Sequence, residues 1–292
     1  MSSDPQRQVE VVRVRGGART VDRDRAATEE PLEIRLHDRP FAVIMRTPGA
    51  DRELAAGFLL AERVLNGADD LGTIAHCTDR GPGAPADAGH ERGDARGHSV
   101  GSSAENVVNV TLANTPAAAL DRILADRRQV TTTSSCGLCG RRTIDSLAAD
   151  AAPIAARWTV GADVIAALPA GLRARQAVFD DTGGLHAAGL FARDGRLLDV
   201  AEDVGRHNAV DKIVGRMLMR DALPLSDYLL CVSGRTSFEI VQKAVFAGLP
   251  VVAAVSAPST LAIELAETLG VTLIGFVRGD AFTIYAHPER VV

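Results

Sequence analysis

Two cysteines near the middle of the chain form a Cys-x-x-Cys pair that is suited to chemistry. Cys136 and Cys139 lie in the segment Ser134-Ser135-Cys136-Gly137-Leu138-Cys139-Gly140, directly after three threonines. Small, polar and glycine-rich residues cannot form a hydrophobic core, so the composition predicts a loop. Two neighbouring thiols in a loop can bind a metal, exchange with a disulfide or carry a sulfur atom.

These three chemistries place different demands on the surrounding sequence. Structural zinc needs a second pair of cysteine or histidine ligands, and the sequence has none at suitable spacing. A thioredoxin-like redox site places its first cysteine just after a buried strand, whereas residues 131–135 are all Thr or Ser. Sulfur carriage needs one exposed thiolate on a loop that is long enough to move between a sulfur donor and a sulfur acceptor. Nearby positive charge favours that thiolate, and four arginines flank the loop: Arg127, Arg128, Arg141 and Arg142. The sequence therefore favours sulfur carriage, with disulfide exchange as the runner-up.

The amino-acid composition excludes several classes of protein. The chain has 292 residues, of which 46% are hydrophobic and 24% charged, as expected for a globular protein of one large or two smaller domains. The net charge of −5 argues against a general nucleic-acid binder. No apolar run reaches the roughly 18 residues of a membrane span, and the first residues are too polar for a signal peptide. Four cysteines in so long a chain are no disulfide framework, so we expect a reducing cytoplasm.

The first part of the chain predicts a small α+β domain over residues 31–128. Residues 1–30 are rich in Arg, Asp and Glu, and we expect them to form a disordered tail. Alternating apolar residues on both sides of residues 37–40 predict a hairpin, after which Asp51 is placed to cap a helix. Residues 78–103 lack apolar periodicity and predict a mobile surface insertion.

The second part, residues 129–292, predicts an α/β sandwich domain that opens with the cysteine loop, residues 131–140. From residue 228 onward, short apolar strands alternate with helical patterns. Such alternation is typical of βαβ units, so we expect a largely parallel sheet that is buried on both faces.

Polar loops follow the strands of this predicted sheet. Ligands of open α/β sheets bind beyond the carboxyl ends of the strands, where helix N-termini supply N–H donors for anions. Ser233-Gly234-Arg235 follows one strand, Ser256 follows the next, and Arg278-Gly279-Asp280 follows the third. Arg235 and Arg278 could each bind a phosphate through two hydrogen bonds. Together the three loops predict a phosphate-bearing ligand, although each alone is also explained by ordinary helix capping.

Two histidines lie upstream of these loops, in segments that are dense in polar groups. His186 follows a Gly-Gly pair, and His207 follows Glu202-Asp203-Val204-Gly205-Arg206. No cysteine or second carboxylate stands at metal-ligand spacing from either one. We therefore expect both rings to be hydrogen-bonded in a site or a core, with no metal bound.

Five motifs occur in order along the chain: Ser134–Gly140, Gly183–Ala188, Glu202–Lys212, Ser233–Arg235 and Gly275–Gly279. Together they resemble the FdhD family, the accessory sulfurtransferases of formate dehydrogenase. The similarity runs from about Pro31 to the last residue, and the insertion 78–103 is its clearest departure.

The resemblance implies a homodimeric sulfurtransferase that takes sulfur from a cysteine desulfurase of the IscS type. The sulfur would pass to the molybdenum or tungsten bis-pyranopterin guanine dinucleotide cofactor before that cofactor enters the catalytic subunit of formate dehydrogenase. Cys136 matches the persulfide-bearing residue, and Cys139 is its neighbour. The resemblance places cofactor binding at Phe276, Val277, Arg278, Gly279, Asp280 and Ala281. From the polar loops and histidines described above, we also expect Ser233, Gly234, Arg235, Ser256, His186 and His207 to take part.

The resemblance also implies a C-terminal three-layer α/β sandwich similar to the cytidine-deaminase fold. Deaminases hold zinc with a His-x-Glu motif and a later Pro-Cys-x-x-Cys motif. Here His186-Ala187-Ala188 lacks the glutamate and the cysteine pair precedes the histidine, so deaminase chemistry is disfavoured. The alternatives to a sulfur carrier are a thiol–disulfide oxidoreductase and a non-catalytic chaperone for the cofactor.

Overall fold

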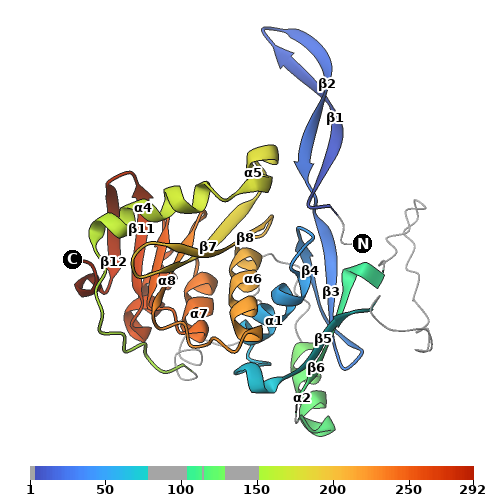
Figure 1. The fold of residues 1–292 in the computed structure, drawn as a ribbon. Coiled ribbons are helices and arrows are strands. Elements are labelled where there is room, and N and C mark those ends of the chain that lie inside the picture. The colour runs from blue at the N-terminus through green and yellow to red at the C-terminus, as the bar shows by residue number, and fades with distance from the viewer. Residues whose placement is uncertain (1–3, 78–103, 114, 129–150) are drawn as a thin grey trace.

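The computed structural model describes residues 4–77, 104–113, 115–128 and 151–292. The predicted insertion 78–103, the cysteine loop 131–140 and the predicted domain boundary at residue 129 lie outside the described residues. Two sheets with their helices make up the body of the protein, and a narrow two-stranded ribbon projects from it (Figure 1).

The first sheet contains four strands from the N-terminal part of the chain, in the order β4-β3-β6-β5. Its elements are β3 (Glu30–Leu36), β4 (Arg39–Arg46), α1 (Asp51–Ala61), η1 (Ala68–Asp70), β5 (Leu71–His76), η3 (Ala104–Asn106), β6 (Val107–Leu112) and α2 (Ala117–Arg128). The predicted hairpin is confirmed, since β3 pairs antiparallel with β4. Its turn is tight enough to hold His37 and Asp38 at φ 48° and 65°.

The second sheet contains six strands in the order β12-β11-β10-β9-β7-β8. Its elements are α4 (Ala162–Arg173), α5 (Ala177–Thr182), β7 (His186–Ala192), β8 (Leu197–Asp203), α6 (Arg206–Met219), β9 (Tyr228–Val232), α7 (Phe238–Ala247), β10 (Val251–Ala254), α8 (Thr260–Leu269), β11 (Thr272–Arg278), β12 (Ala281–Ala286) and η4 (Pro288–Arg290). The three strands β9, β10 and β11 are parallel, whereas β7, β8 and β12 run antiparallel to their neighbours. The predicted parallel arrangement is confirmed for β9, β10 and β11, whereas β12 is antiparallel because a short turn joins it to β11 and cannot make a parallel crossover.

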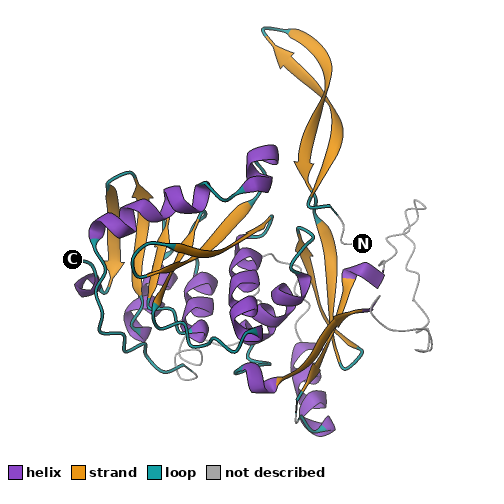
Figure 2. Ribbon diagram, viewed as in Figure 1, coloured by secondary structure: helices purple, strands orange, loops and turns teal. Residues whose placement is uncertain are grey.

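Helices cover both faces of the six-stranded sheet, which gives three layers (Figure 2). On one face, α4 packs Ile165, Leu168 and Leu172 against inward-facing residues of β7, β9, β10 and β11. On the other face, α6, α7 and α8 pack against the alternate residues of the same strands. Burial on both faces explains why these strands are almost continuously apolar. The three-layer α/β sandwich expected from the sequence is therefore present.

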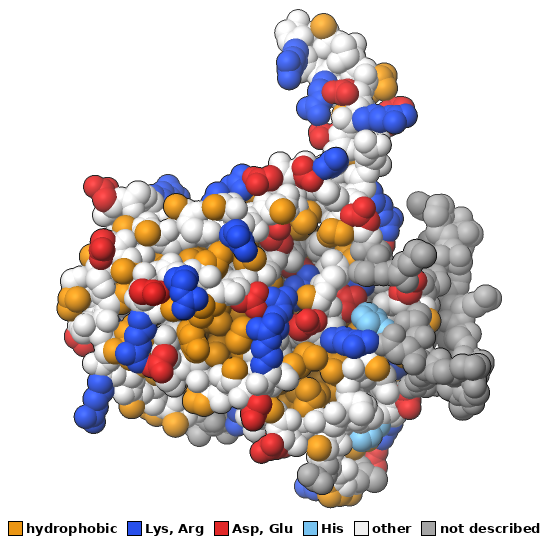
Figure 3. Space-filling view, viewed as in Figure 1, with side chains coloured by type: hydrophobic (Ala, Val, Ile, Leu, Met, Phe, Trp, Pro, Cys, Tyr) orange, Lys and Arg blue, Asp and Glu red, His pale blue; other side chains and the backbone are white. Residues whose placement is uncertain are grey.

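The N-terminal residues form a hairpin, so the prediction of a disordered tail is wrong for them. β1 (Gln6–Arg15) pairs antiparallel with β2 (Ala18–Ala27) along its whole length. The turn between them uses Gly16 and Gly17 at φ 55° and 84°, a region that glycine adopts without strain. Figure 3 shows basic and acidic side chains interleaved along this ribbon. The charges that suggested disorder are cross-strand partners: Arg13 lies 2.8 Å from Asp22 and 3.0 Å from Asp24.

Helices α1 and α6 join the two halves of the molecule. Both carry a glycine at their crossing, and a Cβ added at Gly215 would lie 1.8 Å from the carbonyl oxygen of Glu53. A Cβ added at Gly57 would lie 2.0 Å from the carbonyl oxygen of Asp211. The two backbones can approach this closely only without side chains at these positions. One continuous core follows, because apolar residues of both sheets pack against α1 and α6.

Candidate functional site

One edge of the six-stranded sheet gathers most of the residues that the sequence singled out. The carboxyl ends of β8, β9, β10 and β11 lie at this edge, together with the start of the antiparallel strand β7. Helices α6, α7 and α8 begin there, so their N-termini face the same side. Helix N-termini carry partial positive charge and free N–H groups. We call this edge the carboxyl edge.

Backbone hydrogen bonds join two of the predicted loops to each other and to β11 along the carboxyl edge. The N–H of Thr236 donates to the carbonyl oxygen of Ala257 (3.2 Å), and the N–H of Ser259 donates to that of Thr236 (3.0 Å). The N–H of Phe276 donates to the carbonyl oxygen of Ser256 (3.3 Å). The loops after β9 and β10 are therefore neighbours, as the sequence predicted, and the second of them contacts the last part of β11.

The loop after β9 contacts the start of β7. The hydroxyl of Ser233 accepts from the N–H of Ala187 (2.8 Å), and the N–H of Ser233 donates to the carbonyl of Ala187 (2.9 Å). Gly234 is buried beneath the ring of His186, because a Cβ at Gly234 would lie 3.2 Å from His186 Nδ1. Arg235 is exposed. Burial lowers the pKa of His186, and the positive charge of Arg206 lowers it further, so this imidazole is neutral at neutral pH.

His207 links the starts of two helices. Its Nε2 atom lies 2.9 Å from the hydroxyl oxygen of Ser237 and 2.9 Å from the carboxylate of Glu239. The prediction that this ring is hydrogen-bonded is confirmed. The His186 ring has no hydrogen-bond partner among the residues that the structure describes. No group of three His, Cys, Asp or Glu side chains in the described ranges could hold a metal ion.

The end of β11 displays an aromatic ring. Phe276 has φ 54°, which is rare for a residue with a large side chain, and its side chain remains 40% exposed. The guanidinium carbon of Arg278 lies 5.9 Å from the centre of that ring. Val277 points the other way into the core, so only its backbone is available at the edge. Gly279, at φ 58°, and Asp280 form the turn into Ala281, where β12 begins.

Comparison with known proteins identifies the family. The model of the FdhD/NarQ family matches residues 27–292. The chain belongs to this family. The sulfur carrier protein FdhD of Streptomyces avermitilis is 50% identical over 96% of this chain and 94% of that protein. The sulfur carrier protein FdhD of Mycobacterium tuberculosis is 46% identical over 91% of each chain.

A solved structure shares the fold of the FdhD/NarQ chain. The crystal structure described as a "putative formate dehydrogenase accessory protein" from Desulfotalea psychrophila superimposes with a TM-score of 0.73, at 23% identity. It covers 99% of this chain and 100% of that protein. The β1–β2 hairpin lies almost wholly before the residues that the family model matches.

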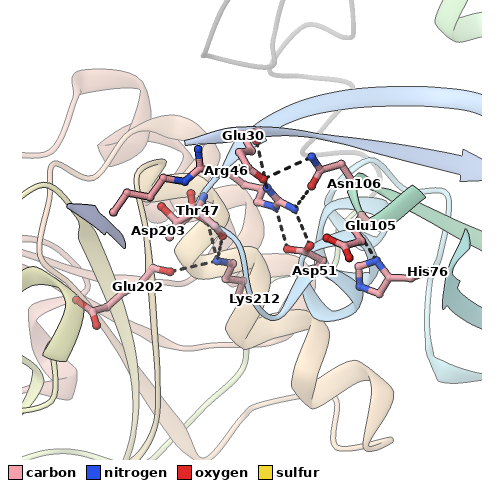
Figure 4. Close-up of polar contacts among 11 residues, drawn as sticks. Glu30, Arg46, Thr47, Asp51, His76, Glu105, Asn106, Glu202, Asp203 and Lys212 are labelled. Carbon is pink, nitrogen blue, oxygen red and sulfur yellow. Dashed lines mark hydrogen bonds and ion pairs between the residues drawn. The ribbon is translucent and has the colours of Figure 1, made fainter. Parts of the chain in front are cut away.

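Where β8 ends at Asp203, on the carboxyl edge, a buried ionic network ties the N-terminal sheet to α6 (Figure 4). Arg46 binds both carboxylate oxygens of Asp51, at 3.0 and 2.8 Å. The prediction that Asp51 caps α1 is wrong, because Ala50 is the N-cap and the side chain of Asp51 forms an ion pair with Arg46. The ammonium of Lys212 lies 2.7 Å from Asp203 and donates to the carbonyl of Thr47 (2.9 Å). The segment 46–51 is thus fixed against the residues that precede and form α6.

Sequence reasoning assigned no role to the two lysines of the chain, although a signal was present. Lys212 and Lys243 are the only lysines in a chain whose other basic residues are all arginine. Both are almost completely buried, and each pairs with a carboxylate: Lys212 with Asp203, and Lys243 with Asp211 at 2.7 Å. A buried ammonium needs such a partner. Burial raises the pKa of Asp211 to about 6 despite Lys243.

The two cysteines within the described residues are poor nucleophiles. Cys231 lies in the core on β9, and burial raises its pKa to about 12. Cys77 is partly buried, and burial raises its pKa as well. The thiolate is the reactive form of cysteine, so neither side chain is suited to sulfur chemistry at neutral pH. Cys136 and Cys139 lie outside the described residues.

Proposed function

We propose that this protein is a sulfurtransferase that carries sulfur on Cys136 to the molybdenum or tungsten bis-pyranopterin guanine dinucleotide cofactor of formate dehydrogenase. Membership of the FdhD/NarQ family is the observation that carries the proposal, since relatives that match over nearly their whole length are named sulfur carrier proteins. The chain has the Cys136-x-x-Cys139 pair, and the other two cysteines have raised pKa values.

Loading of sulfur is an exchange that conserves electrons. The Cys136 thiolate attacks the outer sulfur of a persulfide on a cysteine desulfurase. A new S–S bond forms at Cys136 while the S–S bond of the desulfurase breaks, and the desulfurase leaves as a thiolate. Positive charge favours the attacking thiolate, and the sequence supplies arginines on both sides of the loop.

Delivery of sulfide requires two electrons. The Cys139 thiolate can supply them by attacking the inner sulfur of the Cys136 persulfide, which forms a Cys136–Cys139 disulfide and releases sulfide to the cofactor. A cellular dithiol then reduces the disulfide and restores both thiols. A reducing cytoplasm supplies that dithiol, and we place the protein there.

The carboxyl edge supports the proposed cofactor seat. A guanine dinucleotide brings aromatic bases and phosphates. The exposed ring of Phe276 offers a stacking surface for a base, and Arg278 lies beside that ring. The starts of α6 and α7 offer N–H donors to phosphate, and Ser233, Gly234, Arg235, Ser256, His186 and His207 lie in the loops around them.

Three protein partners follow from this role. The desulfurase supplies sulfur, and the catalytic subunit of formate dehydrogenase receives the finished cofactor. The third partner is a second copy of the chain, as a homodimer.

None of the helices in the described part of the chain is long and apolar enough to cross a membrane.

Loss of Cys136 tests the proposal in cells. In a strain that lacks its own copy of this protein, Cys136→Ala should abolish formate dehydrogenase activity, while Cys77→Ala serves as the matched cysteine control and should preserve it. Full activity of Cys136→Ala, at equal protein level, would refute the persulfide role and leave the chaperone alternative.

A further inference from the structure

The β1–β2 ribbon adds no residue to the core, yet it is fixed to the body at its base. The side chain of Gln6 donates to Asp181 of α5 (2.9 Å), and Arg25 lies 2.6 Å from the same carboxylate. The N–H of Thr28 donates to the carbonyl oxygen of Pro5 (2.8 Å). Beyond this base the ribbon projects past the rest of the described structure (Figure 1). A two-stranded ribbon is only marginally stable in water, so it gains most by packing against another molecule.

The two faces of the ribbon differ in character. The strand register places Val12 directly opposite Val21, and Val14 shares their face. These three side chains, Val12, Val14 and Val21, are 52%, 61% and 70% exposed. The cross-strand ion pairs of Arg13 lie on the opposite face. We call the face with the three valines the valine face. Apolar side chains that are exposed side by side are typical of a surface that contacts a partner.

The ribbon carries positive charge, whereas the remainder of the protein is negative. Residues 6–27 contain six arginines and three acidic residues, a net charge of +3, so the rest of a chain with net charge −5 carries −8. The valine face holds three of these arginines and a single acidic residue, Glu10. Among the described residues, Arg19 and Arg23 on this face form no ion pair. A partner for the valine face should therefore be acidic, and the body of a second copy of this chain meets that requirement.

A matching apolar surface lies on the edge strand β4. Val43 and Met45 stand two residues apart on one face of this strand and are 69% and 50% exposed. Only residues 28 and 29 separate β2 from β3, so the ribbon and the β3–β4 hairpin follow one another along the molecule (Figure 1). The strands also match in length, with 10 residues in β1 and 8 in β4. Two copies placed antiparallel would lay each ribbon along the β3–β4 hairpin of the other.

We propose that two copies of the chain form a dimer by exchanging these ribbons, with the valine face of each packed on Val43 and Met45 of the other copy. Every contact then occurs twice, because the interface is isologous. The contacts join two folded monomers, so they strengthen the dimer without adding to the stability of a monomer. This assignment rests on the homodimer of the proposed function and names its contact surface.

The area of such an exchange is sufficient for a specific interface. A two-stranded ribbon with strands of 10 residues is about 33 Å long and about 10 Å wide, so one face covers about 330 Å². Two exchanged ribbons bury roughly 1,300 Å² in total, counting both surfaces of each contact, whereas a specific interface needs roughly 1,000 Å².

Analytical ultracentrifugation of the full-length protein measures the dimer. The double variant Val12→Ser/Val21→Ser should raise the dissociation constant about a hundredfold or more, because each dimer loses four apolar contacts. Val43→Ser, on the receiving strand, should raise it about tenfold or more. Val9→Ser is the matched control, since Val9 lies on the opposite face of the same ribbon, and it should associate like the wild type. All four side chains are exposed, so circular dichroism should show that each variant remains folded.

The outcomes separate this surface from the rest of the account. Unchanged affinity in Val12→Ser/Val21→Ser or in Val43→Ser would overturn the ribbon exchange and leave a homodimer built on another surface. An equal loss in Val9→Ser would overturn it too. A wild type that stays monomeric, even one whose ribbon binds a different protein, would overturn both the exchange and the homodimer. None of these variants changes Cys136, so loading of sulfur by the desulfurase tests the persulfide role independently.

Discussion

The crossing of α1 and α6 predicts a large effect for a very small substitution, Gly215→Ala. The added methyl group would lie 1.8 Å from the carbonyl oxygen of Glu53, whereas Cβ atoms essentially never approach other atoms within 3.0 Å. The obstacles are backbone atoms of α1, which cannot rotate away. The two helices must separate by at least about 1.2 Å, the difference between these two distances.

Two opposing terms set the size of this effect. Alanine is favoured over glycine inside a helix by about 1 kcal/mol. Forcing an additional methyl group into a packed core costs about 1–3 kcal/mol, and a clash with backbone belongs at the upper end of that range. We therefore expect Gly215→Ala to lower the free energy of unfolding by about 2 kcal/mol or more.

Urea unfolding followed by circular dichroism measures this change. Gly67→Ala is the matched control, because a Cβ at Gly67 would meet no atom within 4 Å and its φ of −170° suits any residue. The control should lie within about 0.5 kcal/mol of the wild type. If Gly215→Ala were as stable as the wild type, the close contact between α1 and α6 would not exist in solution.

Two further predictions concern charge and the N-terminal ribbon. Lys243→Met removes the cation that lowers the pKa of Asp211, so the pKa of this carboxyl group rises further from its value of about 6. Because the folded-state pKa is then raised above the unfolded-state value, the variant loses stability as the pH rises through the pKa of Asp211. Urea unfolding should show that the variant has a free energy of unfolding about 3–5 kcal/mol below that of the wild type at pH 8. The difference should shrink at pH 5, where Asp211 is protonated. Equal differences at both pH values would contradict the buried ion pair. Removing residues 2–26 should change the free energy of unfolding of the monomer by less than about 1 kcal/mol. The reason is that exposed ion pairs such as Arg25–Asp181 hold the ribbon to the body and no residue of the ribbon belongs to the core. A larger loss of stability in the same assay would contradict this prediction.

Local patterns in the sequence predicted most of the elements. Strands such as β3, β4 and β9 carry their periodicity or apolar character within a few residues, so the pattern alone identifies them. The β1–β2 hairpin escaped because the charges that suggested disorder are arranged as cross-strand pairs such as Arg13–Asp22, which become visible only when the two strands are placed side by side. The pairing of β7 with β9 also escaped, because no local pattern identifies which strands lie side by side in a sheet.

The candidate site was predictable to a similar extent. The rule that ligands bind at the carboxyl ends of parallel strands correctly placed the loops at Ser233 and Ser256 side by side. The rule gave no reason to single out Arg206, whose environment depends on the antiparallel strand that brings His186 over Gly234. The Lys212–Asp203 contact depends on the packing of α6 against both halves of the molecule, which no sequence period encodes.

The central claim is that Cys136 carries sulfane sulfur, and intact-protein mass spectrometry tests it most directly. After incubation with a cysteine desulfurase and cysteine, the protein should gain the mass of one sulfur atom at Cys136, and a reductant should remove it. The Cys77→Ala variant should gain the same mass, and Cys136→Ala should not. A protein that only loses two hydrogens, by forming a disulfide, and never gains sulfur would contradict the account and favour a thiol–disulfide oxidoreductase.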